Sequence, residues 1–119
     1  MALLYRIVTT EEWKAFGESG TFSGSMHDLR DGFIHLSAAQ QVAATLAAHY
    51  PGKTGLWLLS IRRDLLEGGS EGKLVWEPSR GGEHFPHFYG TLRIDAVVSF
   101  AALGLDGNGR HVLPSLEMP

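Results

Sequence analysis

Hydrophobic and polar residues alternate over several short segments, a pattern typical of β-strands. We expect strands at residues 2–8, 33–36, 55–61, 73–77 and 94–103, with a short terminal strand at 111–116. The segment 55–61 is apolar on both faces, which favours a central strand. In the first strand Arg6 shares its face with Leu4 and Val8, which is unusual for a charged side chain. An arginine there either reaches water from a sheet edge or serves a binding site.

Two further segments have the apolar spacing of amphipathic helices. The first begins after Thr9, whose hydroxyl and the carboxylate of Glu12 have the spacing of a capping box. The second is predicted from Ser37, which forms a similar pair with Gln40, to about Tyr50. The sequence therefore predicts two short helices, each following a strand.

The remaining segments are predicted to be connections. Residues 20–30 are rich in serine and glycine and are expected to form an irregular surface loop. Residues 64–67 predict a turn or a helical piece, and residues 106–109 a tight turn. Strands and helices alternate first and strands dominate afterwards, so we predict one α+β domain over residues 1–119.

Composition and charge argue against several classes of function. The 119 residues carry a formal net charge of -3, which argues against nucleic-acid binding through a broad basic surface. There is no cysteine, so disulfides and thiolate catalysis are excluded. No apolar run reaches membrane-spanning length and no signal-peptide pattern opens the sequence, so we expect a cytoplasmic protein without a membrane partner.

The stretch 31–37 combines a turn, a short buried strand and a helix start around one imidazole. Asp31 and Gly32 are a turn signal, and the strand that follows carries His35. Ser37 is predicted to open a helix, whose N-terminus favours polar or anionic groups. A hydrogen-bonded core histidine is the structural alternative for His35.

A second stretch, residues 76–90, concentrates aromatic and titratable side chains. Glu77 and His87 are residue types that act as general acid or base, and a carboxylate can orient an imidazole. Arg80 precedes two glycines, so its guanidinium and the nearby amides suit an anion, unless the segment is a plain turn. Tyr89 either contacts a ligand or only satisfies its own hydroxyl.

A metal site is an alternative interpretation of these histidines. His84 and His87 could join His35 in a three-imidazole site, but residues three apart on a strand point to opposite faces, and Pro86 prevents a regular helix. We therefore expect no metal, and a metal-dependent hydrolase is the least favoured function. Serine-hydrolase, dinucleotide and P-loop motifs are absent from the sequence.

Three motifs occur in a recognisable order: Asp31-Gly-Phe-Ile-His-Leu-Ser37, Trp76-Glu-Pro-Ser-Arg-Gly-Gly82 and Phe85-Pro-His-Phe-Tyr-Gly90. With them the chain resembles the domain-of-unknown-function 952 family of small bacterial proteins. Its layout is also distantly similar to the ADP-ribosyltransferase-like fold, which implies a bent, split, mainly antiparallel sheet with two short helices. In that resemblance Arg6 matches the basic residue that meets the NAD ribose, and Glu77 is the candidate for the glutamate of the third motif.

The resemblance implies a small-molecule, nucleotide-like ligand, with NAD or ADP-ribose as the candidate. The candidate catalytic residues are His35, Glu77 and His87, and the candidate ligand-binding residues are Arg6, Ser37, Arg80 and Tyr89. We expect Arg6 to hold phosphate or ribose and Tyr89 to stack on a ring. The alternative is a non-catalytic binding or interaction domain that uses the same cleft.

Overall fold

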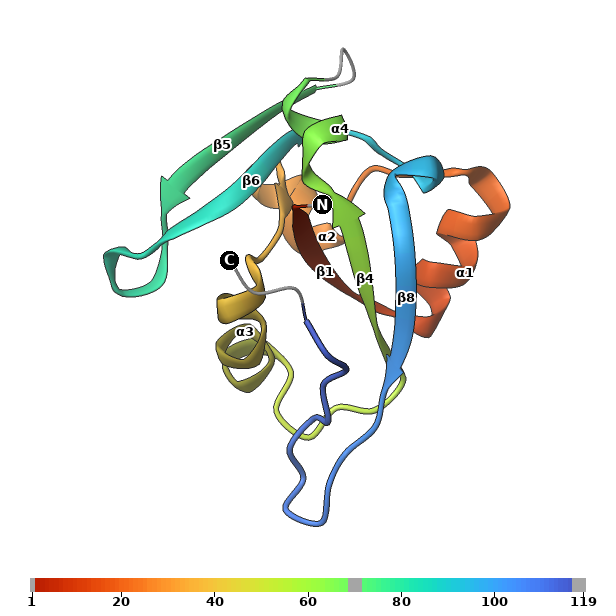
Figure 1. The fold of residues 1–119 in the computed structure, drawn as a ribbon, viewed down its shortest axis with the longest axis vertical. Helices are drawn as coiled ribbons and strands as arrows, with labels where there is room; N and C mark the ends of the chain where they lie inside the picture. The colour runs from red at the N-terminus through yellow and green to blue at the C-terminus, as the bar shows by residue number, and fades with distance from the viewer. Residues whose placement is uncertain (1, 69–71, 117–119) are drawn as a thin grey trace.

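The computed structural model describes residues 2–68 and 72–116, and the side chain of Arg80 is also outside the described part. The fold combines short antiparallel sheets with helices, which confirms the predicted α+β class (Figure 1). The strands are β1 (Leu3–Thr9), β2 (Thr21–Phe22), β3 (Ile34–His35), β4 (Leu56–Arg62), β5 (Gly72–Pro78), β6 (His84–Gly90), β7 (Leu92–Arg93) and β8 (Val97–Leu103). The α-helices are α1 (Thr10–Ser19), α2 (Met26–Asp31), α3 (Val42–His49) and α4 (Arg63–Glu67), and 3-10 turns span Ala39–Gln41, Arg80–Gly82 and Ile94–Ala96.

The strands form three small sheets. β4 lies between β1 and β8, β6 lies between β3 and β5, and β2 pairs with β7. Every pair is antiparallel. The central position predicted for residues 55–61 is therefore confirmed, because β4 has a partner strand on each side.

A short bridge joins the first sheet to the sheet of β3, β5 and β6. The amide of Tyr5 donates to the carbonyl of Ser37 over 2.8 Å, and the amide of Ser37 donates back over 2.9 Å. One residue earlier, the amide of Leu36 donates to the carbonyl of Pro86. This bridge sets Arg6 of β1 beside His35 of β3, although 29 residues separate them.

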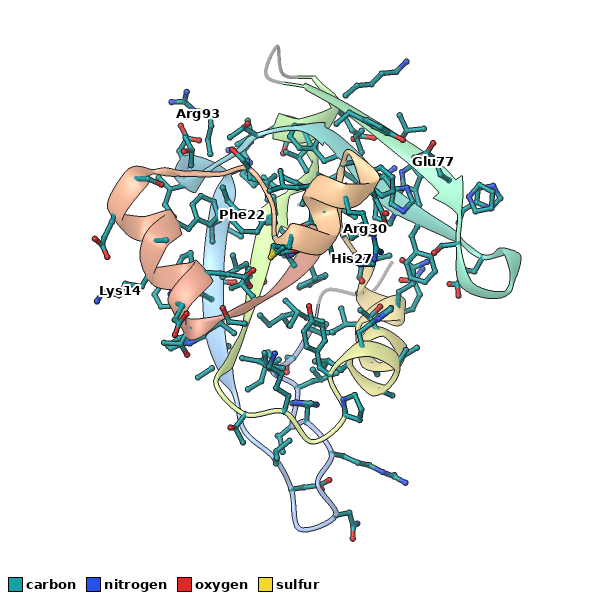
Figure 2. The ribbon with its side chains drawn as sticks, turned by 180° about the vertical axis from the view of Figure 1, so that it is seen from behind. Lys14, Phe22, His27, Arg30, Glu77 and Arg93 are labelled. Carbon is teal, nitrogen blue, oxygen red and sulfur yellow. The ribbon has the colours of Figure 1, made fainter. Side chains whose placement is uncertain are left out.

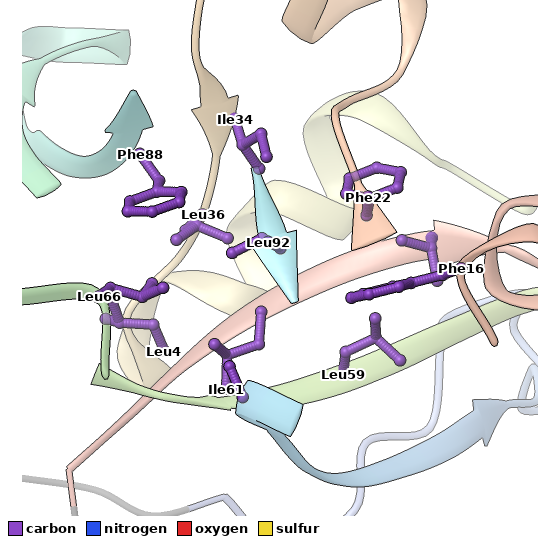
Figure 3. Close-up of a cluster of buried hydrophobic side chains, with 12 residues drawn as sticks. Leu4, Phe16, Phe22, Ile34, Leu36, Leu59, Ile61, Leu66, Phe88 and Leu92 are labelled. Carbon is purple, nitrogen blue, oxygen red and sulfur yellow. The ribbon is translucent and has the colours of Figure 1, made fainter. Parts of the chain in front are cut away.

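The hydrophobic core has two parts, one on each face of the first sheet. On one face, Leu4 and Val8 of β1 pack in a cluster with Phe16 of α1. Figure 3 shows this cluster, with Phe16 and Phe22 at one end and Leu66 and Phe88 at the other. The opposite face packs against α3 through a second cluster, whose buried members are Tyr5, Ile7, Ala39, Val42, Leu46, Leu56, Leu58 and Leu103. Burying each such large apolar side chain stabilises the fold by about 1.5–3 kcal/mol.

The prediction of an irregular loop over residues 20–30 is wrong. This segment holds β2 and α2, and α2 begins at a capping box that pairs Ser25 with Asp28. The helix ends at Gly32, which has a φ of 86° and directs the chain into β3. The described residues therefore hold four α-helices rather than the two that were predicted.

The predicted helix cap at Ser37 is also wrong. Residue 38, an alanine in extended conformation, precedes the 3-10 turn, and α3 begins only at Val42. The Gln41 side chain takes the expected capping role, because its oxygen accepts a hydrogen bond from the Ala38 amide. The Ser37 hydroxyl instead lies 3.2 Å from that of Thr45.

The C-terminal half differs from the prediction in three places. Residues 84–90, which the apolar pattern did not predict as a strand, form β6, because they pair with β5 along its whole length. Residues 94–96 are a 3-10 turn before β8, and β8 lies at a sheet edge with Phe100 58% exposed. The terminal strand at 111–116 is absent from the described residues, where His111 makes only an isolated bridge to Leu105. None of the helices in the described residues is long and apolar enough to span a membrane.

Candidate active site

A buried ion pair lies at the centre of the candidate site. Both terminal nitrogens of Arg6 contact Asp28, with Nη1 2.9 Å from Oδ1 and Nη2 2.8 Å from Oδ2. The side chains are 6% and 1% exposed, respectively. Arg6 Nη1 also donates to the carbonyl of His35, and its guanidinium lies 5.1 Å from the centroid of the Phe22 ring. The alternative that Arg6 reaches water from a sheet edge is therefore wrong.

Asp28 receives hydrogen bonds from three segments of the chain. Besides the two from Arg6, it accepts from the amide and hydroxyl of Ser25 and from the amide and ring of His35. Burial on its own would raise the pKa of this carboxyl, but the hydrogen bonds from His35 and Arg6 and the charge of Arg6 outweigh it. The pKa of Asp28 therefore lies far below its ordinary value, and Asp28 is a carboxylate at neutral pH.

His35 lies between two carboxylates. Its Nδ1 is 2.7 Å from Asp28 Oδ1, and its Nε2 is 3.0 Å from Asp31 Oδ2. Since the buried Asp28 carboxylate only accepts, Nδ1 must carry the proton that joins them. The pKa of Asp31 is lowered, because hydrogen bonding and the charges of its cationic neighbours outweigh the opposing desolvation.

His87 forms a second imidazole–carboxylate pair. Its Nδ1 lies 2.8 Å from Glu77 Oε1, and the hydroxyl of Tyr89 donates to the same oxygen over 2.7 Å. Glu77 comes from β5 (Figure 2) and His87 from the neighbouring β6. The pKa of Glu77 is lowered by the hydrogen bond from Tyr89 first and by that from His87 second, and the pKa of Tyr89 is raised in return. Because Nδ1 donates to Glu77, the lone pair of His87 lies on Nε2.

The structure brings the two histidines together. His35 and His87 are directly opposite each other in the β3–β6 ladder, and their ring centroids are 5.5 Å apart. The ring of Phe33 stacks on His87 at 4.0 Å and fixes its plane. Two imidazoles, each oriented by its own carboxylate, thus share one region of the surface.

Both histidines line a pocket of about 250 Å³. Arg6 and Ser37 also line it, so four of the seven predicted site residues meet there. Glu77 and Tyr89 are not in the pocket wall, and they reach it only through the contact between Glu77 and His87. The side chain of Arg80 lies outside the described part of the structure. The roles of all these residues in binding or catalysis stay predictions.

Several wall residues were missed by the sequence analysis. They are Asp28, which links Arg6 to His35, and four polar or aromatic residues of α2 and of the segment around α3: His27, Thr45, His49 and Tyr50. A signal for Asp28 was present in the Ser-x-x-Asp spacing with Ser25, which is typical of a helix start. No local pattern points to Thr45 or Tyr50, because α3 reaches the pocket only through the tertiary fold.

The arrangement is suited to proton transfer. His87 presents an unprotonated Nε2, while Glu77 holds the ring in one tautomer and stabilises the imidazolium that forms. The pocket wall contains one guanidinium and one carboxylate, which neutralise each other, and four imidazoles.

Comparison with known proteins agrees with the motifs. The crystal structure of protein CC0527 from Caulobacter crescentus is 43% identical, covers 92% of this chain and 93% of that chain, and superposes with a TM-score of 0.83. The solution NMR structure of CC0527 is also 43% identical, covers 92% and 91% of the two chains, and gives a TM-score of 0.79. No curated protein matches the chain significantly. The model of the protein family of unknown function DUF952 matches residues 7–100, and the chain belongs to this family.

Proposed function

We propose that the pocket binds a phosphorylated nucleotide of the NAD or ADP-ribose type. The observation that carries this proposal is the pair of carboxylate-oriented imidazoles, His35 and His87, in the wall of one pocket. A wall rich in imidazole attracts an anionic ligand in a protein whose net charge is otherwise negative. The distant resemblance to ADP-ribosyltransferases, which rests on the sequence alone, points to the same ligand class.

The size of the pocket limits which part of the ligand enters. A volume of about 250 Å³ is smaller than the space that drug-sized ligands occupy, roughly 300–1,000 Å³. A ribose with one phosphate or one ring fits such a space, and a whole dinucleotide does not. We therefore expect the remainder of the ligand to lie along the surface outside the pocket.

The wall offers a partner for each part of a ribose phosphate. Ser37 and Thr45, whose hydroxyls lie 3.2 Å apart, are both in the pocket wall, where a sugar hydroxyl group can exchange hydrogen bonds with them, and the ring of Tyr50 offers an apolar surface for a base. Arg6 Nε is buried and has no hydrogen-bond partner among the described residues, so one polar atom of this wall residue is unsatisfied. In this proposal Tyr50 replaces Tyr89 as the stacking residue, because Tyr89 is outside the wall and donates to Glu77.

For catalysis, we assign His87 the role of general base or acid and Glu77 that of a positioning residue. His87 Nε2 would take a proton from an attacking hydroxyl or water while Glu77 stabilises the resulting charge. A non-catalytic binding module is the second candidate, because it would use the same pocket without proton transfer.

Calorimetry with ADP-ribose on chelator-treated protein tests binding. We expect a dissociation constant between micromolar and millimolar, weakened about 2- to 10-fold in Ser37→Ala by the loss of one hydrogen bond. The matched control is Ser99→Ala, since Ser99 is exposed on β8 and outside the pocket. Absence of binding to the unmodified chain, or equal losses in both variants, would contradict the proposal.

Chromatographic measurement of NAD consumption separates the two candidates. If the protein is an enzyme, Glu77→Gln should lower kcat by about 10²- to 10⁴-fold with little change in ligand affinity, because an amide can favour the wrong tautomer of His87. Binding of ADP-ribose without any NAD turnover would instead support the binding module.

A further inference from the structure

Three potential metal ligands converge at the edge of the pocket. They are His27 and Asp31, one turn apart on α2, and His35 on β3, with one ligand atom from each lying within 4.8 Å of the others. Asp31 Oδ2 is 3.5 Å from His27 Nε2 and 3.0 Å from His35 Nε2. Figure 2 labels His27 on α2. This cluster is not the combination of His84, His87 and His35 that the sequence suggests as a metal site. His84 is exposed and lies outside the pocket wall.

Nε2 of His35 lies beside a carboxylate oxygen, in a position that suits a cation. Nδ1 donates its proton to Asp28, so a neutral His35 would direct the lone pair of Nε2 at the Asp31 carboxylate, 3.0 Å away. Two electron-rich atoms at that distance repel each other unless a proton or a metal ion lies between them.

We propose that His27, Asp31 and His35 bind a divalent transition-metal ion of the Zn²⁺ type. Ligand distances of about 2.0–2.2 Å in tetrahedral geometry place neighbouring donor atoms about 3.3–3.5 Å apart. The two donor separations from Asp31, 3.0 and 3.5 Å, are close to this range, and the ligand atoms of His27 and His35 lie within 4.8 Å of each other. Two imidazoles with one carboxylate favour Zn²⁺ and its neighbours in the first transition row over Mg²⁺ and Ca²⁺, which prefer oxygen ligands only.

The surroundings of His35 have the form found around metal-binding histidines. Such a histidine usually donates its other ring nitrogen to a carboxylate, which fixes its orientation and increases its basicity. Asp28 does this for His35, and Asp28 is itself held by Arg6. Three protein ligands leave a tetrahedral ion one open position for water or a substrate oxygen, and His27 and His35 both line the pocket.

Arg30 opposes metal binding through its contacts with two of the proposed ligands. Arg30 Nη2 lies 2.7 Å from His27 Nδ1, and a guanidinium can only donate, so His27 carries its proton on Nε2 when it is neutral. Arg30 Nε also donates to Asp31 Oδ1 over 3.2 Å, so metal binding must move the His27 proton to Nδ1 and displace Arg30, whose side chain is 68% exposed, from both residues. Removing Arg30 should therefore strengthen binding.

Isothermal titration of Zn²⁺ into the full chain, purified without a histidine tag and treated with chelator, tests the proposal. We expect one equivalent to bind with a micromolar or lower dissociation constant. Asp31→Asn and His27→Ala should each weaken binding at least 10-fold, and Arg30→Ala should tighten it. Asp31 and His27 are 32% and 51% exposed in their side chains, so these variants should fold.

The matched control is His84→Ala, which removes an exposed imidazole elsewhere and should leave Zn²⁺ affinity unchanged. Co²⁺ in place of Zn²⁺ should give the visible absorption of a four-coordinate site, and the band should disappear in His27→Ala. Absence of binding at 100 μM Zn²⁺ would overturn the proposal, as would losses in His84→Ala equal to those in Asp31→Asn. The proposal is independent of the nucleotide ligand, because the ADP-ribose titration uses metal-free protein.

Discussion

Replacement of Asp28 by asparagine is the most informative single change in this structure. Asp28 Oδ1 accepts three hydrogen bonds, one from Arg6 and two from His35, and Oδ2 accepts another three, one from Arg6 and two from Ser25. Asparagine keeps one of these oxygens and replaces the other with an amide nitrogen that itself donates. In either orientation, three donors therefore face a donor, and the charge that balances Arg6 is lost.

The expected loss of stability is large for a substitution that hardly changes volume. Removing one partner of a buried ion pair costs about 3–5 kcal/mol, because the other charge stays buried and unbalanced. For 119 residues the unfolding entropy is roughly 0.25 kcal/mol/K, at about 2.1 cal/mol/K per residue. The melting temperature should therefore fall by about 12–20 °C in Asp28→Asn.

Urea unfolding followed by circular dichroism, with a thermal melt beside it, measures this loss. The folded-state pKa of Asp28 is depressed, so its contribution is complete above the unfolded-state pKa of about 3.9 and is lost as the pH falls further. The difference in unfolding free energy between the unmodified chain and Asp28→Asn should be large at pH 5 to pH 7, where the Asp28 carboxylate is ionised in both the folded and the unfolded chain. It should shrink steadily below about pH 4.

The control is Asp64→Asn, which removes a carboxylate paired with Arg62 at the surface. Asp64 is 60% exposed, so the melting temperature of the Asp64→Asn variant should hardly differ from that of the unmodified chain. A loss below 1 kcal/mol in Asp28→Asn at unchanged urea m-value would refute the reasoning. A difference that grows as the pH falls below 4 would refute the assignment of Asp28 as a charged, hydrogen-bonded carboxylate.

Two further predictions concern single contacts. Tyr89→Phe removes the hydrogen bond that contributes most to the lowered pKa of Glu77. A carbon-detected NMR titration of Glu77 should therefore give a higher pKa in the variant than in the unmodified chain. An unchanged pKa would contradict the contact between Tyr89 and Glu77. Gly24→Ala should destabilise the fold by about 1–3 kcal/mol, because Gly24 has a φ of 118° and a Cβ there would lie 2.7 Å from Cβ of Asp28. Gly107→Ala is the control in the same urea measurement, since a Cβ there meets nothing within 4 Å, and equal losses would contradict the steric argument.

Local sequence patterns predicted correctly those elements in which the regularly spaced apolar residues are also the buried ones. The alternation that places Leu4, Arg6 and Val8 on one face of β1 is present in the structure, as is the capping box of Thr9. The prediction for residues 20–30 failed because the serines and glycines of this segment also suit a loop, although Ser25 caps the start of a helix. A helix of six residues is too short for apolar periodicity to become visible in the sequence.

The candidate site was predictable only in part, for a different reason. Its histidines stand out in the sequence, and the β3–β6 pairing brings His35 and His87 together. Whether a carboxylate meets a given imidazole depends on contacts across 7 residues for Asp28 and His35 and across 10 for Glu77 and His87. Sequence alone identifies the residue types, while the tertiary fold selects which carboxylate each histidine contacts.

The contacts of Asp28 also decide where function can be tested without loss of the fold. Arg6 and Asp28 are buried and His35, which is 29% exposed, is hydrogen-bonded to Asp28, so a change in any of the three alters both stability and the pocket wall. Glu77 and Asp31 contact the same two imidazoles from the exposed side, where their side chains are 35% and 32% exposed. Substitution of these two carboxylates changes the proton or metal chemistry of each histidine and leaves the buried network intact. Effects on turnover or Zn²⁺ binding at Glu77 and Asp31 can therefore be assigned to the site, whereas the same effects at Asp28 cannot be separated from unfolding.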